Sequence, residues 1–495
     1  MARVACLFSI EFNDTVEHPL PDWYKIPHGL SVIAACVERA GHDVRCWVVC
    51  PDTSLASTAD EIVRQFGCDT VLASAVTTQF PLISRLCSHI KELKASIPIL
   101  LGGVHASLRS EECLAHPAID AICIGEGEDA AVAWVDAISQ GRQPSQIPGA
   151  WIKFPGSSDI ERTPPAPFRT NLDELPLVNY AHWERWVDPE NRNVSVVVGR
   201  GCPYSCTYCS NHAIRRLQPG AYVRFRSPEN ILSEIDVLLR RFSDLTAIYF
   251  EIETIGESIP WVLQLCEHLA ILNASRKSPI QFRANLAVTS QLAQDDSRIH
   301  ELLSALRRAN FVALNIGLES GSPRIRKDIM NRPPYTDADL IRFCRSAREH
   351  GIDVYLYVLV GVPTETPADA LRTSAIARAC QPQDIYPAVY YPYPGTRLHD
   401  LSAQMHLIDP GKMGTRAERS RVYLKLPGFP RWRVFFEFVV MKWRVFHGRR
   451  NPIWLIRITM WMMLGIVPHV FNLLAHAERA LRRLRRQVKS VVLAR

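Results

Sequence analysis

The sequence lacks several features that would place it in a common class. It has no run of roughly 20 apolar residues, the length that a membrane-spanning helix needs, and its longest clean apolar run, Ile458–Val467, is about half as long. Met1–Ser9 is a strand-like run without a charged start and a long apolar stretch, so we expect no secretory signal. No G-x-G-x-x-G follows the first predicted strand and no P-loop lysine is present, which argues against a phosphate-binding fingerprint.

A fourth cysteine is missing from the most distinctive segment, GRGCPYSCTYCSN at residues 199–211. The three that are present, Cys202, Cys206 and Cys209, have the spacing C-x3-C-x2-C and follow a strand-like run. Three such thiolates suit an Fe–S cluster, and a four-iron cluster held by them would keep one iron open. An open position is typical of a catalytic metal centre. The alternative is a loop of buried or disulfide-bonded cysteines.

This segment resembles the signature of the radical S-adenosylmethionine (SAM) superfamily, C-x3-C-x-aromatic-C, with Tyr208 as the aromatic residue. The resemblance implies a [4Fe-4S] cluster whose open iron binds the amino and carboxylate groups of SAM. It also implies one-electron reduction by a flavodoxin- or ferredoxin-type donor, with release of a 5′-deoxyadenosyl radical. Because an open cluster and 14 cysteines survive best under reducing conditions, we expect a cytoplasmic protein.

Residues 1–141 alternate strand and helix patterns in the order of a doubly wound, Rossmann-like parallel sheet. Ligands of such sheets lie beyond the carboxyl ends of the strands. The unusual loops occur at these ends, and paired glycines there let backbone approach a flat or bulky ligand. The loop residues are Thr78, Gln79, Gly102, Gly103, His105, Gly125, Glu126 and Gly127.

Together these loops resemble the cobalamin-binding domain that precedes many radical SAM cores, with its GG-x-H-A and GEGE segments. A plain flavodoxin-like domain with tight turns is the alternative. The D-x-H-x-x-G motif that supplies an axial histidine to cobalt is absent, and His18 does not replace it. The resemblance therefore implies cobalamin without a histidine on cobalt, its lower face met by the loop of Thr78 and Gln79. His105 would either hydrogen-bond the corrin side chains or simply begin a helix.

Residues 142–192 are rich in Pro, Gly and Ser and are expected to be a linker, with a hairpin-like stretch near 150–154. In residues 193–400, six strand-like runs are each followed by a helical pattern or a turn, which predicts a barrel or part of one. Six units match the open, TIM-type partial (βα)6 barrel of the radical SAM family.

Functional groups of such barrels project from the strand ends. By resemblance, Glu253 would bind the SAM amino group, Asn285 the ribose or carboxylate, Glu319 the ribose or an arginine bound to it, and the backbone at Gly361 the adenine. Arg283 is either a ligand contact or a structural ion-pair partner. The tyrosines of 390–393 either line the substrate entrance or fill the barrel end.

Residues 401–495 form a helical C-terminal region that is apolar and basic: residues 431–495 contain 14 Lys and Arg but only two acidic residues, Glu437 and Glu478. A basic amphipathic region with tryptophans is typical of peripheral membrane contact through 431–495. The alternatives are a soluble helical cap and insertion into the membrane. No nucleic-acid-binding module is recognised, so nucleic acid is not expected as a partner.

The sequence therefore predicts a cobalamin-dependent radical SAM enzyme, with C-methylation of an unactivated carbon as the main hypothesis. A non-methylating oxidation, cyclisation or rearrangement with the same cofactors is the alternative. A tRNA methylthiotransferase is disfavoured, because the scattered cysteines of residues 1–141 form no second three-cysteine motif. The substrate would be a small molecule or, if the tail contacts a membrane, a lipid-like one.

Overall fold

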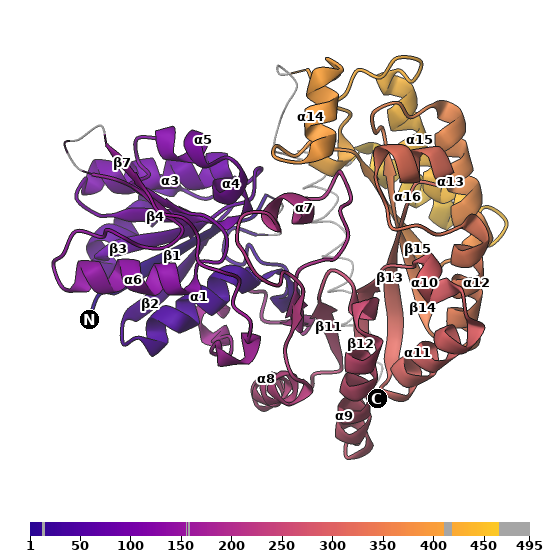
Figure 1. Ribbon diagram of the computed structural model, residues 1–495, viewed down its shortest axis with the longest axis horizontal. Coiled ribbons are helices and arrows are strands. Elements are labelled where there is room, and N and C mark those ends of the chain that lie inside the picture. Colours follow the sequence, from indigo (N-terminus) through magenta and orange to yellow (C-terminus); the bar gives the residue numbers. More distant parts are fainter. Residues whose placement is uncertain (12–14, 155, 157–158, 410–417, 465–495) are drawn as a thin grey trace, which may run out of the picture.

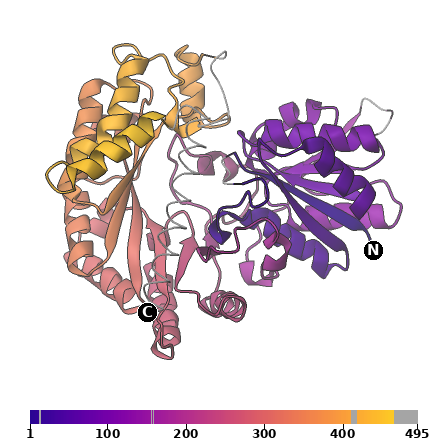
Figure 2. The same cartoon turned by 180° about the vertical axis from the view of Figure 1, so that it is seen from behind.

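The protein consists of two α/β bodies that lie side by side, with the cysteine loop between them (Figures 1 and 2). The computed structural model describes residues 1–11, 15–154, 156, 159–409 and 418–464. The N-terminal body carries the indigo and purple elements of Figure 1, and the second body carries the magenta to yellow ones.

The N-terminal sheet has seven strands in the order β2-β1-β3-β4-β5-β6-β7. Its five parallel strands are β1 (Arg3–Ser9), β2 (Asp43–Val49), β3 (Thr70–Ser74), β4 (Ile99–Gly102) and β5 (Ala121–Cys123). Because both faces are covered by helices, the central strands are buried almost throughout, as expected for a parallel sheet. The order reverses between β1 and β3, which is where such sheets bind ligands.

Helices cover both faces of this sheet. One face carries α1 (His28–Arg39) and α6 (Glu128–Ser139), which contact each other, and the other carries α2 (Leu55–Asp60) and α3 (Phe80–Leu93). Two short helices, α4 (Gly103–Leu108) and α5 (Ser110–Ala115), follow β4 and were not predicted. The segment expected as a linker adds two antiparallel edge strands, β6 (Ala150–Lys153) and β7 (Ile160–Arg162).

The second body contains six parallel strands in sequence order, β8-β11-β12-β13-β14-β15. They are β8 (Val194–Val197), β11 (Ala247–Glu251), β12 (Gln281–Leu286), β13 (Phe311–Glu319), β14 (Asp353–Val360) and β15 (Asp384–Val389). Within the described residues, no pairing joins β8 to β15, so the barrel stays open. The predicted partial (βα)6 barrel is thereby confirmed.

The helices of this barrel begin at identifiable caps. Thr336 and Thr366 form capping boxes with Asp339 and Asp369. The outer helices are α8 (Pro228–Arg241), α9 (Ile259–Ala274), α10 (Ser290–Ala293), α11 (Asp296–Arg308), α12 (Asp337–Glu349) and α13 (Pro367–Cys380). Stacked phenylalanines, with Phe250 and Phe282 ring centroids 5.1 Å apart, fill the layer beneath them.

Three further helices follow the barrel: α14 (Arg397–Gln404), α15 (Arg431–Phe446) and α16 (Pro452–Leu464). Helix α15 packs on α13 and β15, and α16 packs on α15. In the described part of the chain, no helix is both long and apolar enough to cross a membrane. The predicted basic helix after residue 464 lies outside the described residues.

Candidate active site

A cavity of about 600 Å³ lies where the two bodies meet. Its N-terminal side is formed by the start of α1 and by loops at the carboxyl ends of β3, β4 and β5. Its other side is formed by the ends of β8 and β11 and by the start of the cysteine loop. Of the predicted residues, the structure brings seven to this lining: Gly102, Gly103, Gly125, Glu126, Gly127, Glu253 and Asn285.

Gly102 and Gly103, at the end of β4, are subject to different steric constraints. Gly103 has a φ of +91°, and a Cβ there would lie 2.7 Å from the carbonyl oxygen of Ala75. A Cβ on Gly102 would meet no atom closer than 3.9 Å, so it would occupy cavity space. The loop therefore offers bare backbone to a bulky flat group, and the residues fit a corrin or its side chains.

The predicted residues Thr78, Gln79 and His105 lie beside this cavity but outside its lining. Gln79 fixes its loop by donating to the carbonyl oxygen of Ser9 at 2.6 Å and accepting from the amide of Val76 at 3.0 Å. His105 is buried in α4 with its Nδ1 3.3 Å from the hydroxyl of Thr77, and burial lowers its pKa. His105 therefore supports the neighbouring loop from within a helix.

The cysteine loop is held at its base by a two-stranded ribbon, β9 (Gly199–Arg200) and β10 (Arg224–Phe225), and contains the short helix α7 (Asn211–Ile214). The thiols of Cys202, Cys206 and Cys209 are free. They lie close enough to interact, and burial raises the pKa of Cys202 to about 12. Because the three thiols are free, the alternative of a disulfide-bonded loop does not apply.

In the described residues, no three His, Cys, Asp or Glu side chains are arranged around one metal ion. Each cysteine of an Fe–S cluster binds its own iron atom, so this spread of thiols is compatible with a cluster and not with a single ion. Two side chains outside the motif also reach the sulfurs. Asn211 donates to the Sγ of Cys209 at 3.4 Å, and Arg332 to that of Cys206 at 3.8 Å.

Glu253 lies on the cavity side of the cysteine loop, directly after β11. Its carboxylate is open to the cavity but surrounded by protein, and this loss of water raises its pKa. Hydrogen bonding by Asn211 and the charges of Arg200 and Arg224 act in the opposite direction. Among the described residues, Glu253 forms no ion pair, so the carboxylate fits a cationic ligand beside Cys202 and Cys209.

Glu319 lies on the far side of the loop, at the end of β13, with a positive φ of 58°. Burial raises its pKa, whereas the guanidinium of Arg332 and the hydroxyl of Tyr208 lower it. Arg332 donates to the hydroxyl of Tyr208 at 3.1 Å and to the carbonyl of Gly317 at 2.5 Å. Its buried Nε has no hydrogen-bond partner among the described residues, which leaves one donor for an anionic ligand group.

Gly361 has a positive φ of 83° and packs against Val434 of α15, where a Cβ would approach to 2.8 Å. Its amide donates to the buried carboxyl of Glu365 at 2.5 Å, and the amide of Val362 donates to the same oxygen at 3.2 Å. Burial raises the pKa of Glu365 to about 8. The Gly361 amide is thus already bonded, so only other backbone groups of this turn would be available to a ligand.

Asn285 points from β12 into the barrel, where the hydroxyl of Tyr249 donates to it at 2.6 Å. The face of the strands that lines the barrel also carries Tyr355, Tyr357 and Tyr386, and Tyr357 and Tyr386 remain 37% and 43% exposed. Tyr390 and Tyr391 are buried, in agreement with a packing role. Arg283 is exposed at the barrel's lower end and forms no ion pair among the described residues.

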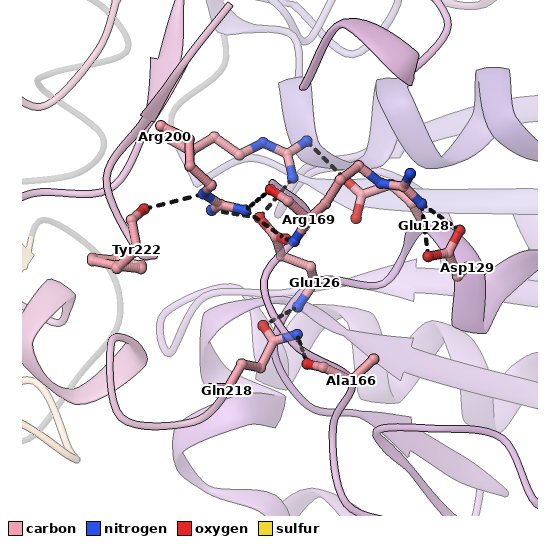
Figure 3. A network of polar contacts seen from close by, with 9 residues as sticks. Glu126, Glu128, Asp129, Ala166, Arg169, Arg200, Gln218 and Tyr222 are labelled. Atoms are coloured by element: carbon pink, nitrogen blue, oxygen red, sulfur yellow. Dashed lines mark hydrogen bonds and ion pairs between the residues drawn. The ribbon is translucent and has the colours of Figure 1, made fainter. Parts of the chain in front are cut away.

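Ion pairs join the two bodies at the edge of the cavity (Figure 3). The carboxylate of Glu126 accepts hydrogen bonds from Arg200 at 2.9 Å and from Arg224 at 2.8 and 2.9 Å, and Glu128 accepts one from Arg200 at 2.6 Å. The amide of Glu126 donates to Gln218 at 2.9 Å. Glu126 is therefore bonded to the cysteine loop, a role that its motif did not predict.

No sequence pattern indicated several of the residues that form this site. Arg332 lies in a loop without periodicity, and Asn211 lies in the short helix α7 at the end of the cysteine segment. Nothing in the sequence shows which acidic residues Arg200 and Arg224 contact; the one available clue was that Arg200 lies inside this segment and Arg224 lies shortly after it.

Two families match the chain in the order that the fold suggests. Residues 22–135 match the B12 binding domain, and residues 196–375 match the radical SAM superfamily. The protein is a cobalamin-dependent radical SAM enzyme. Its cofactors are a [4Fe-4S] cluster, SAM and cobalamin.

Methyltransferases and a cyclase are among its relatives. An uncharacterised methyltransferase from Pyrococcus horikoshii is 25% identical over 77% of this chain and 79% of its own length. The anaerobic magnesium-protoporphyrin IX monomethyl ester cyclase of Rubrivivax gelatinosus is 26% identical over 69% of this chain, a match that spans 60% of the cyclase. The hopanoid C-3 methylase of Methylococcus capsulatus is 24% identical over 78% of this chain and 72% of its own.

The same two-body fold occurs in two solved radical SAM enzymes. TsrM from Kitasatospora setae, a methyltransferase solved with cobalamin and a [4Fe-4S] cluster, has a TM-score of 0.66 and 17% identity, covering 92% of each chain. OxsB, solved with aqua-cobalamin and SAM, also has a TM-score of 0.66, with 16% identity over 96% of this chain and 72% of its own. At these identities the likeness establishes the fold.

Proposed function

We propose that this radical SAM enzyme is a C-methyltransferase that acts on an unactivated carbon of a small or lipid-like molecule. The observation that carries the proposal is the shared cavity: loops of the B12-binding body and the unpaired Glu253 beside the cysteine motif line the same space. Methylases of hopanoids and other methyltransferases among the relatives support methylation. The cyclase match supports the second candidate, an oxidative cyclisation.

The residues divide into three groups by the cofactor they would hold. Cys202, Cys206 and Cys209 would bind the cluster, and the SAM contacts would be Tyr208, Glu253, Asn285, Glu319 and the turn at Gly361. The cobalamin contacts would be the loops that carry Thr78, Gln79, Gly102, Gly103, His105, Gly125 and Gly127. When bound, the cluster with SAM supplies a 5′-deoxyadenosyl radical, and cobalamin supplies a transferable methyl group.

The protein's own contribution is binding and exclusion of water. Glu253 would hold the SAM ammonium, because it opens into the cavity, forms no ion pair among the described residues and is partly desolvated, so a cation would stabilise its charge. Arg332 would hold a carboxylate or ribose oxygen through its unpartnered Nε. The substrate would lie in the open barrel against Tyr249, Tyr357 and Tyr386, whose amphipathic rings lie on the strand face that lines the barrel.

We also propose working domain limits of 1–141, 142–192, 193–400 and 401–495, and a cytoplasmic protein that receives electrons from a flavodoxin- or ferredoxin-type donor. Peripheral membrane contact is supported by exposed apolar side chains on α15 and α16: Trp432, Phe436, Ile453, Ile456 and Met460. Flotation with anionic liposomes tests it, because a protein without this contact stays at the bottom of the gradient.

The function is tested with anaerobically reconstituted enzyme, methyl-labelled SAM and a substrate-containing metabolite extract. Labelled product together with 5′-deoxyadenosine supports methylation, whereas unlabelled product together with 5′-deoxyadenosine supports cyclisation or oxidation. Cys206→Ala should lose the iron–sulfur absorption and both products. Cys266→Ala, at a buried cysteine of α9, is the matched control and should keep them. Wild-type protein that takes up neither iron nor cobalamin would refute the proposal.

A further inference from the structure

The cavity lining carries more negative than positive groups. Four carboxyl groups face it, on Glu126, Glu128, Glu251 and Glu253, but only two guanidinium groups, on Arg200 and Arg224. Burial raises the pKa of Glu251 to about 7, and the nearby ammonium of Lys25 opposes this. Glu253 remains without a counter-ion in the described structure, although both arginines are close enough for their charges to act on it.

Arg200 and Arg224 are held by hydrogen bonds to two glutamates of the B12-binding body. Arg200 donates one nitrogen to Glu126 and the other to Glu128, and Arg224 donates both of its terminal nitrogens to Glu126 (Figure 3). Arg224 also donates to the carbonyl of Arg169 at 2.8 Å. Glu128 and Arg224 are each only 6% exposed, so these pairs are shielded from water and hold their geometry.

Two carboxylates of the lining, on Glu251 and Glu253, form no ion pair among the described residues, and the charges of both arginines act on Glu253. Arg200 belongs to β9, which directly follows Val198, and the amide of Val198 donates to the carbonyl of Glu251 at 3.1 Å. Glu251 ends β11, and Glu253 lies two residues beyond that end. An arginine bound to Glu253 would occupy the carboxylate that a cationic ligand needs. The arginine and the ligand would therefore compete for Glu253. The acidic turn after β5 therefore decides whether Glu253 is available.

We propose that Glu126 and Glu128 are positioning residues that hold Arg200 and Arg224 away from Glu253, keeping this carboxylate free for the ammonium of SAM. The proposal rests on the SAM-binding role of Glu253 proposed above. It takes Glu126 out of the set of cobalamin contacts. It also links the two bodies, because a turn of the B12-binding domain prepares the SAM site of the barrel.

The test compares SAM dissociation constants of reconstituted variants, measured without substrate from the spectral change of the reduced cluster. Glu126→Gln/Glu128→Gln should bind SAM about tenfold or more weakly, since Arg200 then competes for Glu253. Adding Arg200→Gln to this pair should restore the affinity to within about threefold of the wild type. Asp129→Asn is the matched control: it removes a pair with Arg169 next to the same turn but leaves Arg200 bound, and should not change the affinity.

Unchanged affinity in the double variant, or equal weakening in the double and triple variants, would overturn the inference. If the double variant does not fold, Arg200→Gln alone decides: affinity equal to or above that of the wild type supports the proposal, and a loss would make Arg200 itself a SAM contact. Glu253→Gln separates the two proposals. If it binds SAM normally, the role of Glu253 is wrong; if it binds weakly while the double variant does not, only the inference fails.

Discussion

Two carboxylates flank the cysteine loop, and they are neutralised in different ways. Glu253 follows the end of β11, faces the cavity and, among the described residues, has a backbone amide and the side chain of Asn211 as hydrogen-bond partners but no ion pair. Glu319 ends β13, is enclosed by protein and shares Arg332 and Tyr208. The arginines near the first carboxylate are bound to Glu126 and Glu128, so it is arranged to receive a cation from outside, whereas the second shares Tyr208 with the guanidinium of Arg332. Similar strand-end positions in one barrel thus differ in how far the protein itself supplies the positive charge.

The largest effect that sharpens this contrast is expected at Arg332. Arg332→Met removes the positive charge that acts on the half-buried Glu319, which should cost about 1–3 kcal/mol of unfolding free energy. Arg332→Met/Glu319→Gln removes both charges and should recover most of this loss. Chemical denaturation of anaerobically prepared protein measures both variants. Equal losses in the two would mean that Glu319 does not depend on Arg332.

A third carboxyl at the barrel mouth, Glu365, has neither arrangement. It is buried, accepts two backbone amides, and its pKa of about 8 lies above its usual 4.5. Because the folded protein holds this proton more tightly than the unfolded chain, the stabilisation is complete below about pH 4.5 and is lost as the pH rises through 8.

Glu365→Gln should therefore remove this pH-dependent loss of stability. Between pH 6 and 9 the wild type should lose roughly 2 kcal/mol of stability relative to the variant, whose amide oxygen can still accept from Gly361 and Val362. Denaturation at several pH values measures the difference. Glu349→Gln, at an exposed position of α12, is the control and should follow the wild type. Parallel pH profiles for Glu365→Gln and the wild type would show that the carboxyl is ionised throughout.

Helices and strands could be predicted from the sequence better than the contacts that their residues make. All six barrel strands and the outer helices other than the short α10 were predicted from strand-like and helical patterns, because such patterns reflect which face is buried. The cysteine motif, Glu253 and Glu319 could be placed because strand ends follow from strand positions. Arg332 could not, since it lies 13 residues beyond Glu319 in a loop whose path depends on tertiary packing. The hairpin-like stretch predicted near 150–154 corresponds to β6, but its antiparallel pairing at the edge of the N-terminal sheet was not predicted, because pairing partners depend on tertiary packing.

The smallest expected effect on stability is that of a substitution at Glu253, on the cavity side of the cysteine loop. Glu253→Gln should change the stability of the SAM-free protein by no more than about 0.5 kcal/mol, because no ion pair is lost and an enclosed charge is removed. SAM at one fixed excess concentration should raise the denaturation midpoint of the wild type but raise that of Glu253→Gln less, since stabilisation by a ligand grows with the logarithm of its affinity. Asp129→Asn serves as the control and should respond to SAM like the wild type. A large loss of stability in SAM-free Glu253→Gln would show that this carboxylate, like Glu319, has a structural partner, and the contrast between the two sides of the loop would then be wrong.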